Sequence, residues 1–547
     1  MTARCRLLCP AHNTRQLWGE DVFQFKRIVA AALACIVASA PILAQDSLDD
    51  RGAFVRILSD SINALEGFVF KTVTIGGLEV EWIVAFLALP MIVLTLYFGF
   101  VNLTSFKRAW RIIKGDYHDP KADGEVTQFQ ALSTALSGTV GLGNIAGVAV
   151  AISTGGPGAT FWMILIGFCA MSLKFAECTL GVKYRVVRED GTVAGGPMYY
   201  LERGLKSRGE GWAKVGKILA WSYAIIAVPT LLQVAQVNQS YEAISIATGY
   251  NSQLAQWGFG FFIAGMTAIV IIGGIKSIAQ VTSRLVPAMA GIYILTAVVI
   301  LAANAQLILP AFEVIFSKAM SLEAGLGGLV GTIIIAMQRA VYSTEAGLGS
   351  ATMAHAAAKT NEPVSEGMVA LMEPFIDTVI VSTMTALVIV IATINLGGDF
   401  AQEDAVRTAL LQGVQLADGA GTNTTGITLT SQAFANAVSW FPWVLAFAAF
   451  LFAFSTIISW GYYSGKVWEF VFGGSNRSMM TFKIVFCVAL IPGALLTAGE
   501  VYSLMDSMFF LMAVPNVIGI YLLAPELKRD LKSYLSRLRT GEIKANN

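Results

Sequence analysis

Polar residues lie in the middle of a segment that is otherwise apolar and long enough to cross a membrane, Gln128–Thr154. Four glycines, two hydroxyls and an amide fall between Ser137 and Gly147. Glycine disfavours a helix interior because it loses more backbone entropy on ordering than other residues. In hydrocarbon, an unwound backbone leaves N–H and C=O groups unpaired unless protein, water or a ligand satisfies them. We therefore predict a broken transmembrane helix whose break is a binding site.

A second segment, Leu329–Ala356, repeats this pattern. Its centre, 338–350, combines glycines and hydroxyls with an embedded Arg339 and Glu345. It is the fifth span after the first segment, counting spans of ~20 residues, and because five is odd the two segments cross the membrane in opposite directions. Such glycines could mark close helix packing. Paired interruptions in two inverted halves instead favour a transporter binding site between them.

The composition indicates that most of the surface faces lipid. Of 547 residues, 55% are hydrophobic and 13% are charged, whereas a soluble domain has ~25% charged residues. A formal net charge of +1 indicates no nucleic-acid partner. The six cysteines and three histidines form no recognisable metal or catalytic motif. No P-loop signature is present, so we expect no ATP-driven pump. Neither a cofactor nor an obligate protein partner is indicated.

Apolar runs of about the length needed to cross a bilayer predict an all-α polytopic membrane protein with about eleven helices. One extra helix at 82–103 precedes two five-helix repeats, 128–309 and 329–524, that are inverted relative to each other. The predicted spans are Trp82–Leu103, Gln128–Ser153, Ala159–Leu180, Ile218–Ala243, Trp257–Ile275, Val286–Leu309, Leu329–Ala356, Met368–Ile394, Val438–Tyr463, Ile484–Thr497 and Leu504–Ala524.

Loop charge predicts the orientation. Lys and Arg are concentrated in 104–127, 181–217 and the tail 525–547. The loops predicted on the opposite side of the membrane, 246–256, 310–328 and 396–436, carry almost none. Basic loops remain in the cytoplasm, so the C-terminus is predicted to be cytoplasmic.

The N-terminal region resembles a secretory signal peptide. Lys26 and Arg27 precede an Ala-rich apolar run that ends at Ala44. We predict a signal peptide at 1–44, with an uncleaved anchor as the alternative. The segment 45–81 is then periplasmic, which agrees with the loop charges and places the protein in a bacterial inner membrane.

Several sequence strings, in this order, resemble the alanine or glycine:cation symporter family from about the first span to the tail. That resemblance implies a LeuT-type fold, a small neutral amino acid such as alanine or glycine as substrate, and Na⁺, sometimes H⁺, as the coupling ion. One position departs from the family pattern, because Thr344 stands where Asn is frequent. The matching strings are 141–148, 155–163, 174–177, 182–185, 195–200, 338–350 and 354–356.

Such a substrate is a zwitterion with a small side chain. Its carboxylate can bind backbone amides at the N-terminal end of a half-helix, where the helix dipole is positive. Its ammonium needs acceptors, such as freed carbonyls around 341–344 or a side-chain amide, and bulky residues must wall the pocket. The predicted substrate-binding residues are Thr139, Gly141, Gly143, Asn144, Gln236, Tyr342, Ser343, Thr344, Gly347, Thr456 and Trp460.

The coupling cation prefers hard oxygen ligands, namely carbonyls and hydroxyls. The family resemblance implies that hydroxyls of the ninth predicted span meet a sodium ion that also binds carbonyls of the first broken helix. The sodium site would therefore use Ser455 and Thr456 with the backbone at Gly138 and Val140. Such hydroxyls could instead bond back to carbonyls of their own helix.

Charged residues inside the spans are costly there and should face the bundle interior or water. We assign them structural roles. Arg339 and Glu345 are expected to form a pair or a gate, Lys174 and Glu177 an ion pair with loop neighbours, Glu373 and Asp377 a gate or an anchor, and His355 a packing position.

A secondary symporter is the favoured function, and a proton-coupled or a glutamine- or serine-preferring symporter is the first alternative. A channel would also use broken helices, but channels commonly build pores from rings of subunits. A membrane enzyme needs a positioned acid, base, nucleophile or metal, and no such constellation is found in the sequence.

Overall fold

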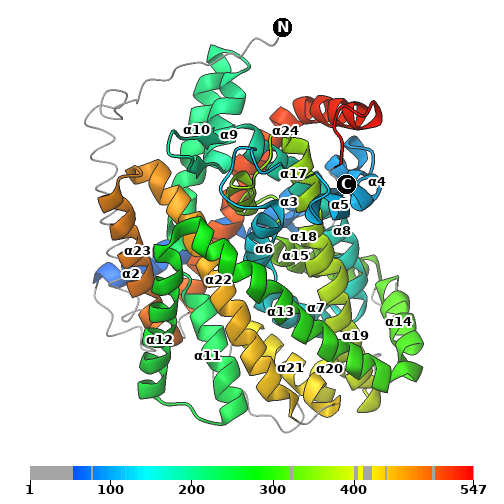
Figure 1. Ribbon diagram of the computed structural model, residues 1–547. Coiled ribbons are helices and arrows are strands. Elements are labelled where there is room, and N and C mark those ends of the chain that lie inside the picture. Colours follow the sequence, from blue (N-terminus) through cyan, green and yellow to red (C-terminus); the bar gives the residue numbers. More distant parts are fainter. Residues whose placement is uncertain are drawn as a thin grey trace.

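The computed structural model describes residues 53–545 except 76–77, 118, 321–324, 399–404, 411–421, 438–439 and 496–498. The predicted signal peptide, 1–44, lies outside these residues. The described chain is a bundle of helices with two short antiparallel hairpins (Figure 1). The hairpins pair β1 (Thr72–Ile75) with β2 (Leu78–Glu81) and β3 (Val186–Val187) with β4 (Val193–Ala194).

Apolar helices make up the bundle, as predicted. Among the described residues, eight helices are long and apolar enough to cross a membrane, and a bent pair adds a ninth. Two shorter apolar helices, Trp82–Tyr97 and Leu329–Thr344, fall on two further predicted spans. The all-α polytopic class is thus confirmed, while the number eleven and the inverted repeat stay predictions.

The helices have the following bounds: α2 (Ala53–Val69), α3 (Trp82–Tyr97), α4 (Val101–Thr104), α5 (Phe106–Ile113), α6 (Gln128–Thr139), α7 (Leu142–Gly155), α8 (Gly158–Lys183), α9 (Pro197–Lys206), α10 (Glu210–Ala227), η2 (Val228–Leu231), α11 (Val234–Thr248), α12 (Gln253–Ile272), α13 (Gly274–Ala303), α14 (Ala305–Ala319), α15 (Gly325–Thr344), α16 (Ala351–Ala356), α17 (Pro363–Ala370), α18 (Met372–Pro374), η3 (Phe375–Ser382), α19 (Thr383–Asn395), α20 (Ala405–Leu410), α21 (Thr422–Ala437), α22 (Phe441–Phe472), α23 (Asn476–Leu490), η4 (Ile491–Ala494) and α24 (Gly499–Arg539).

The first predicted break is present. Helix α6 ends at Thr139 and α7 begins at Leu142, with a bend of 42° between them. In a continuous helix the Gly141 amide would donate to the Ser137 carbonyl. It donates instead to Oδ1 of Asn144, at 3.0 Å. The Asn144 side chain therefore caps α7 by satisfying an amide that the break leaves free.

The second predicted break is present as well. Helix α15 ends at Thr344 and α16 begins at Ala351. Three residues of the intervening segment have a positive φ, namely Glu345 at 50°, Gly347 at 91° and Gly349 at 80°. Glycine adopts this region without penalty, whereas a glutamate there is uncommon and must be held by its surroundings.

Three amides at 346–348 turn away from the end of α15. They donate to the Thr344 hydroxyl at 3.3 Å, the Glu177 carboxylate at 3.2 Å and the Glu345 carbonyl at 3.2 Å. A continuous helix would direct these amides to the carbonyls of 342–344. Those three carbonyls are therefore without their helical donors.

Two other predicted spans are irregular. The span at 218–243 is interrupted by the 3₁₀ turn η2, in which Pro229 lacks the amide that a helix needs. The span at 368–394 contains a π-helical stretch, η3, a rare form that occurs frequently at functional sites. The span predicted at 286–309 begins earlier, at Gly274, and ends at Ala303.

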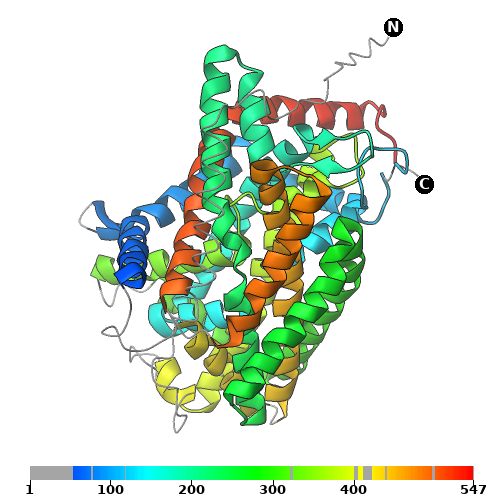
Figure 2. The ribbon, with the colours of Figure 1, turned by 90° about the vertical axis from the view of Figure 1, so that its left-hand side faces the viewer.

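The basic segments share one end of the bundle. Helices α5 and α9 and the C-terminal end of α24 lie at the top in Figure 1, and α20 and α21 lie at the bottom. Figure 2 shows the last part of α24 running across that same end. Contacts join these segments, because Lys183 lies 2.5 Å from Asp530 and Arg537 lies 2.8 Å from Glu362.

Glycines allow η4 to fit closely beside α11 and α12. A Cβ atom at Gly260 of α12 would lie 1.9 Å from the Ile491 carbonyl oxygen, and one at Gly493 would lie 2.7 Å from Cβ of Val237. No real side chain tolerates either distance, so the backbones meet directly, as small residues permit in membrane helices.

We expect Gly260→Ala to separate α12 from η4 and to destabilise the protein by ~1–3 kcal/mol, because overpacking forces backbone shifts. Gly258→Ala is the matched control, since it lies in the same helix and a Cβ there meets nothing within 4 Å. Thermal unfolding of the two purified variants compares them. Equal melting temperatures would contradict the close packing.

Candidate functional site

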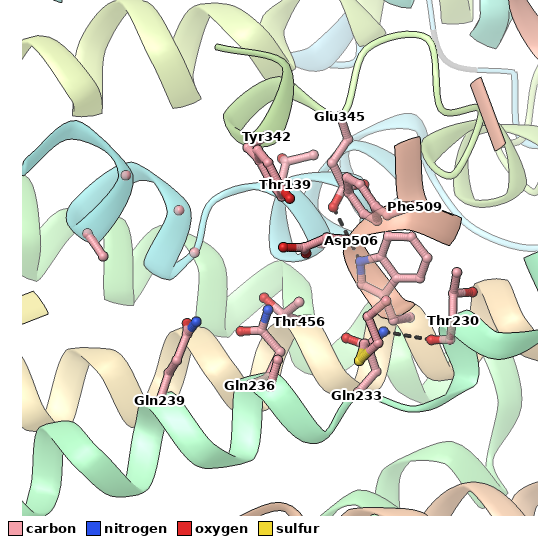
Figure 3. Close-up of a pocket in the computed structure, with 18 of the residues that line it drawn as sticks. Thr139, Thr230, Gln233, Gln236, Gln239, Tyr342, Glu345, Thr456, Asp506 and Phe509 are labelled. Atoms are coloured by element: carbon pink, nitrogen blue, oxygen red, sulfur yellow. Dashed lines mark hydrogen bonds between the residues drawn. The ribbon is translucent and has the colours of Figure 1, made fainter. Parts of the chain in front are cut away.

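A cavity of about 140 Å³ lies between the two helix breaks (Figure 3). Helices α11, α22 and α24 complete its walls. The lining residues are Gly138, Thr139, Gly141, Gly143, Ala146, Gly147, Thr230, Gln233, Ala235, Gln236, Gln239, Arg339, Tyr342, Glu345, Thr456, Trp460, Met505, Asp506 and Phe509.

Most of the predicted substrate-binding residues line this cavity. They come from four separate parts of the chain, which the fold brings together although they are far apart in sequence. The N-terminal end of α7 opens onto the cavity through Gly141 and Gly143. The Gly141 amide is taken by Asn144, while the first-turn amide of Gly143 has no partner within the helix. The predicted residues in the lining are Thr139, Gly141, Gly143, Gln236, Tyr342, Thr456 and Trp460, together with Gly138 from the predicted sodium site.

Four predicted substrate-binding residues are outside the lining. Asn144 is fully buried and its amide nitrogen donates to Ser343 Oγ at 2.7 Å and to the Asp377 carboxylate. The Thr344 hydroxyl bonds back to the Ala340 carbonyl at 2.9 Å. The amide of Gly347, the fourth, is engaged by Glu177, as described above. These residues shape the breaks, and direct contact with a substrate stays a prediction for them.

The predicted sodium ligands of α22 face the end of α6. The Thr456 hydroxyl lies 3.0 Å from the Ser137 carbonyl, the oxygen that the break deprives of its helical donor. The Ser455 hydroxyl lies 3.4 Å from the same carbonyl and 2.9 Å from the Phe452 carbonyl of its own helix. Ser455 and Val140 are outside the cavity lining. Two hydroxyls and a freed carbonyl thus meet at one point.

The cavity also contains polar residues that the sequence analysis did not place there. Gln233 and Gln239 flank Gln236 at intervals of three residues, a polar stripe on α11 that could have been recognised. Asp506 of α24 also lines it. The side-chain oxygen of Gln236 is buried and has no hydrogen-bond partner among the described residues.

Arg339 and Glu345 also line the cavity, but they do not form the expected pair. Glu345 accepts hydrogen bonds from Ser350 Oγ at 2.7 Å and from Trp460 Nε1 at 3.3 Å. The Arg339 guanidinium lies 5.8 Å from the centre of the Tyr342 ring. Glu345 is therefore held by hydrogen bonds at the edge of the cavity, and Arg339 lies beside an aromatic ring of its wall.

Aromatic rings form one wall of the cavity, and both aromatic residues predicted for it, Tyr342 and Trp460, are among them. Phe509 of α24 lies between them, with its ring centre 6.1 Å from that of Tyr342 and 5.5 Å from that of Trp460. These offset contacts are favourable for aromatic pairs. The wall limits the size of a bound side chain.

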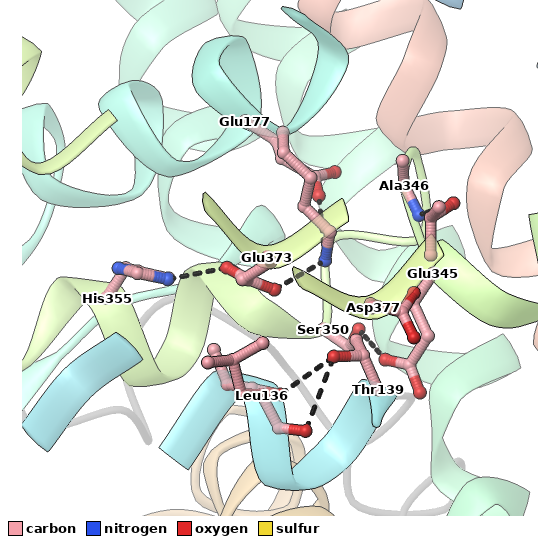
Figure 4. Close-up of polar contacts among 12 residues, drawn as sticks. Leu136, Thr139, Glu177, Glu345, Ala346, Ser350, His355, Glu373 and Asp377 are labelled. Carbon is pink, nitrogen blue, oxygen red and sulfur yellow. Dashed lines mark hydrogen bonds and ion pairs between the residues drawn. The ribbon is translucent and has the colours of Figure 1, made fainter. Parts of the chain in front are cut away.

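A buried ionic cluster holds the second break (Figure 4). Lys174 Nζ lies 3.2 Å from Glu373 and 3.6 Å from Glu177, and the ring nitrogens of His355 lie 2.6 Å from Glu373 and from Glu366. All five side chains are fully buried. The expected ion pair of Lys174 with Glu177 is thus present, whereas the expected loop neighbours are wrong, because the further partner of Lys174 is Glu373 of α18.

A metal ion could in principle bind in this cluster. The ligand atoms of Cys178, His355 and Glu373 lie within 4.8 Å of one another. Both ring nitrogens of His355 already bond to carboxylates. An ion would have to displace one of those bonds, so the arrangement fits a structural ionic network better.

Comparison with known proteins agrees with the geometry. The model of the sodium:alanine symporter family matches residues 66–547. A "Sodium/alanine symporter AgcS" of Methanococcus maripaludis is 37% identical over 83% of this chain and 94% of its own length. A "Putative sodium/proton-dependent alanine carrier protein" of Bacillus subtilis is 32% identical over 82% of this chain and 90% of its own length.

More distant similarities were found as well. A "Probable sodium/glutamine symporter" of Bacillus subtilis is 27% identical over 83% of this chain and 89% of its own length. Among solved structures, MhsT in complex with L-phenylalanine aligns with a TM-score of 0.49 and 14% identity, over 74% of this chain and 89% of that one. From the extent of the family match, we conclude that this chain belongs to the sodium:alanine symporter family, a family of membrane transporters.

Proposed function

We propose that this protein is a secondary active symporter that imports a small neutral amino acid, alanine or glycine, together with Na⁺. The observation that carries this proposal is the cavity between two broken helices. Its volume corresponds to a few water molecules at ~30 Å³ each, which suits a small substrate. Family membership supports the same class of transport.

The substrate carboxylate binds at the N-terminal end of α7 in this proposal. Gly143 presents a first-turn backbone amide there, Gly141 lets the substrate approach the backbone closely while its own amide stays with Asn144, and the helix dipole favours a negative charge. The ammonium lies among the oxygens of Gln236, Glu345 and the freed carbonyls at the end of α15. A zwitterion thus meets opposite partial charges at the two breaks.

The sodium ion binds where α22 faces the end of α6. Thr456 and Ser455 provide hydroxyls, and the backbone around Gly138 and Val140 provides carbonyls alongside that of Ser137. Hard oxygen ligands of this kind suit Na⁺. The site adjoins the cavity at Gly141, because a Cβ atom there would lie 3.4 Å from Thr456 Oγ1.

The protein lies in a bacterial inner membrane with its C-terminus in the cytoplasm and its mature N-terminus in the periplasm. The gathering of Lys- and Arg-rich segments at one end of the bundle supports this orientation. Na⁺ then moves into the cell down its own gradient, and this movement drives the uptake of the substrate.

Glutamine is a second candidate substrate. Three glutamine side chains, Gln233, Gln236 and Gln239, line the cavity from α11, and amides pair well with amides. A relative carries the printed name of a sodium/glutamine symporter.

We expect proteoliposomes containing the purified protein to accumulate alanine or glycine only when Na⁺ is higher outside. A zwitterion carries no net charge, so co-transport of Na⁺ moves charge, and ~100 mV, negative inside, supplies ~2.3 kcal/mol per charge. Radiolabelled uptake with and without valinomycin measures this. A panel that includes serine and glutamine separates the candidate substrates. Uptake that ignores both Na⁺ and voltage would exclude the proposal.

We expect Thr456→Val to raise the Na⁺ concentration for half-maximal uptake by ~10–100-fold, because it removes an oxygen from the cation site. Thr393→Val is the matched control. Its hydroxyl is also fully buried and, among the residues that the structure describes, bonds only to the Ile389 carbonyl of its own helix. Half-maximal Na⁺ concentrations that are equal in the wild type and Thr456→Val would remove Thr456 from the sodium site.

A further inference from the structure

The segment that follows α3 carries a cluster of positive charges. Residues 98–115 contain four basic side chains and no acidic one. Three of them, Lys107, Arg111 and Lys114, are exposed and recur at intervals of three or four residues along α5, so they share one face of that helix. Arg111 is paired with Asp116 at 2.7 Å, whereas the two lysines form no ion pair among the residues that the structure describes.

Large apolar side chains lie on the same face. Trp110 is 50% exposed between the cations, and Leu103, one turn before Lys107, is 61% exposed. The Lys114 ammonium lies 5.4 Å from the centre of the Trp110 ring. Tryptophan beside basic residues is typical of the headgroup level of a bilayer, where an aromatic ring meets both lipid and water. We call Leu103, Lys107, Trp110, Arg111 and Lys114 the outer face.

The length of α3 places the outer face at that level. Helix α3 has 16 residues, which at ~1.5 Å per residue span ~24 Å, whereas the hydrocarbon core is ~30 Å thick. Because the charged Glu81 directly precedes α3, the remaining thickness lies beyond its last residue, Tyr97. Gly99 and Phe100 have φ angles of 66° and 54° and turn the chain there. Helices α4 and α5 follow at the edge of the bundle (Figure 1).

The opposite face of α5 packs into the bundle. Ala109 and Ile112 are buried, and α5 contacts α17 and α6. The Phe106 ring meets the Phe375 ring edge to face, with 4.7 Å between their centres. Phe375 is the first residue of η3. Helix α5 is therefore fixed from the inside, and its outer face is held toward the surroundings of the bundle.

We propose that the outer face binds the headgroups of anionic phospholipids. The three cations contact lipid phosphates through charge-assisted hydrogen bonds, and Trp110 and Leu103 lie among the first carbons of the acyl chains. Basic clusters directly after a membrane span attract anionic lipids in this way. A soluble phosphate would satisfy the cations but leave both apolar side chains in water. The inference goes beyond transport and requires only that the chain lies in a membrane.

Binding of tritiated phosphatidylglycerol to the purified full-length protein, in a neutral detergent at constant concentration, tests the proposal by scintillation proximity. We expect unlabelled phosphatidylglycerol to compete for the bound label and phosphatidylcholine with the same acyl chains to compete at least ~10-fold less well. Replacing the three cations together, Lys107→Gln, Arg111→Gln and Lys114→Gln, should raise the half-saturating concentration ~100-fold, since each cation near a lipid surface strengthens binding roughly fivefold.

A matched control removes the same charge elsewhere on the same end of the protein. It combines Lys206→Gln, Arg208→Gln and Lys214→Gln, three exposed residues at the tip formed by α9 and α10. This tip protrudes from the top of the bundle in Figure 1, away from the lipid. The control should bind phosphatidylglycerol as the wild type does.

Equal competition by the two lipids, or wild-type affinity in the α5 triple variant, would overturn the proposal. If that variant does not purify as a monodisperse protein, Trp110→Ser decides the matter. It keeps every charge, and loss of the ring should weaken binding ~10-fold; unchanged binding overturns the proposal. Inorganic phosphate, added at constant ionic strength, should not displace the lipid. Displacement would assign the cations to a soluble anion and overturn the lipid assignment.

Discussion

Every backbone N–H and C=O group at membrane depth must find a partner, and this requirement governs the structure. The chain breaks two helices there and reassigns the amides that the breaks release. The Gly141 amide goes to a side-chain oxygen of Asn144, and the Gly347 amide goes to the carboxylate of Glu177. The carbonyls on the opposite ends lose their helical donors, and that of Ser137 accepts the Thr456 hydroxyl instead. The backbone groups that can bind a ligand therefore depend on which side chains cap each break.

The buried charges follow from the same requirement. Glu177, which accepts the Gly347 amide, lies 3.6 Å from Lys174, and Lys174 is shared with Glu373. His355 then joins Glu373 to Glu366. A carboxylate that holds an unwound segment in lipid thereby requires a chain of compensating partners. This explains why so many ionisable groups lie fully buried in a transporter whose proposed substrate is neutral overall.

Much of the fold could be predicted from the sequence, because clusters of glycine indicate helix breaks and the lengths of apolar runs indicate membrane spans. Both interruptions, at 140–141 and 345–350, were located in this way. The pair of Lys174 with Glu177 was predicted from their i, i+3 spacing, but the contact with Glu373 could not be, since Glu373 is distant in sequence and only tertiary packing brings it near. The cavity contribution of Asp506 was missed for the same reason. The turn at Pro229 could not be predicted from proline alone, because Pro287 and Pro515 lie inside helices of the same protein.

Helix α24 joins two distant parts of the molecule in a single element. Its N-terminal half contributes Asp506 and Phe509 to the cavity, and its C-terminal end holds Glu362 of the loop between α16 and α17 through Arg537. Pro515 and Pro525 interrupt the hydrogen bonding between these ends. A tilt of the cavity half would therefore either bend at these prolines or carry the loop with it. The stiffness of α24 between Pro515 and Pro525 therefore determines how far a tilt of its cavity half is transmitted to the loop that contains Glu362.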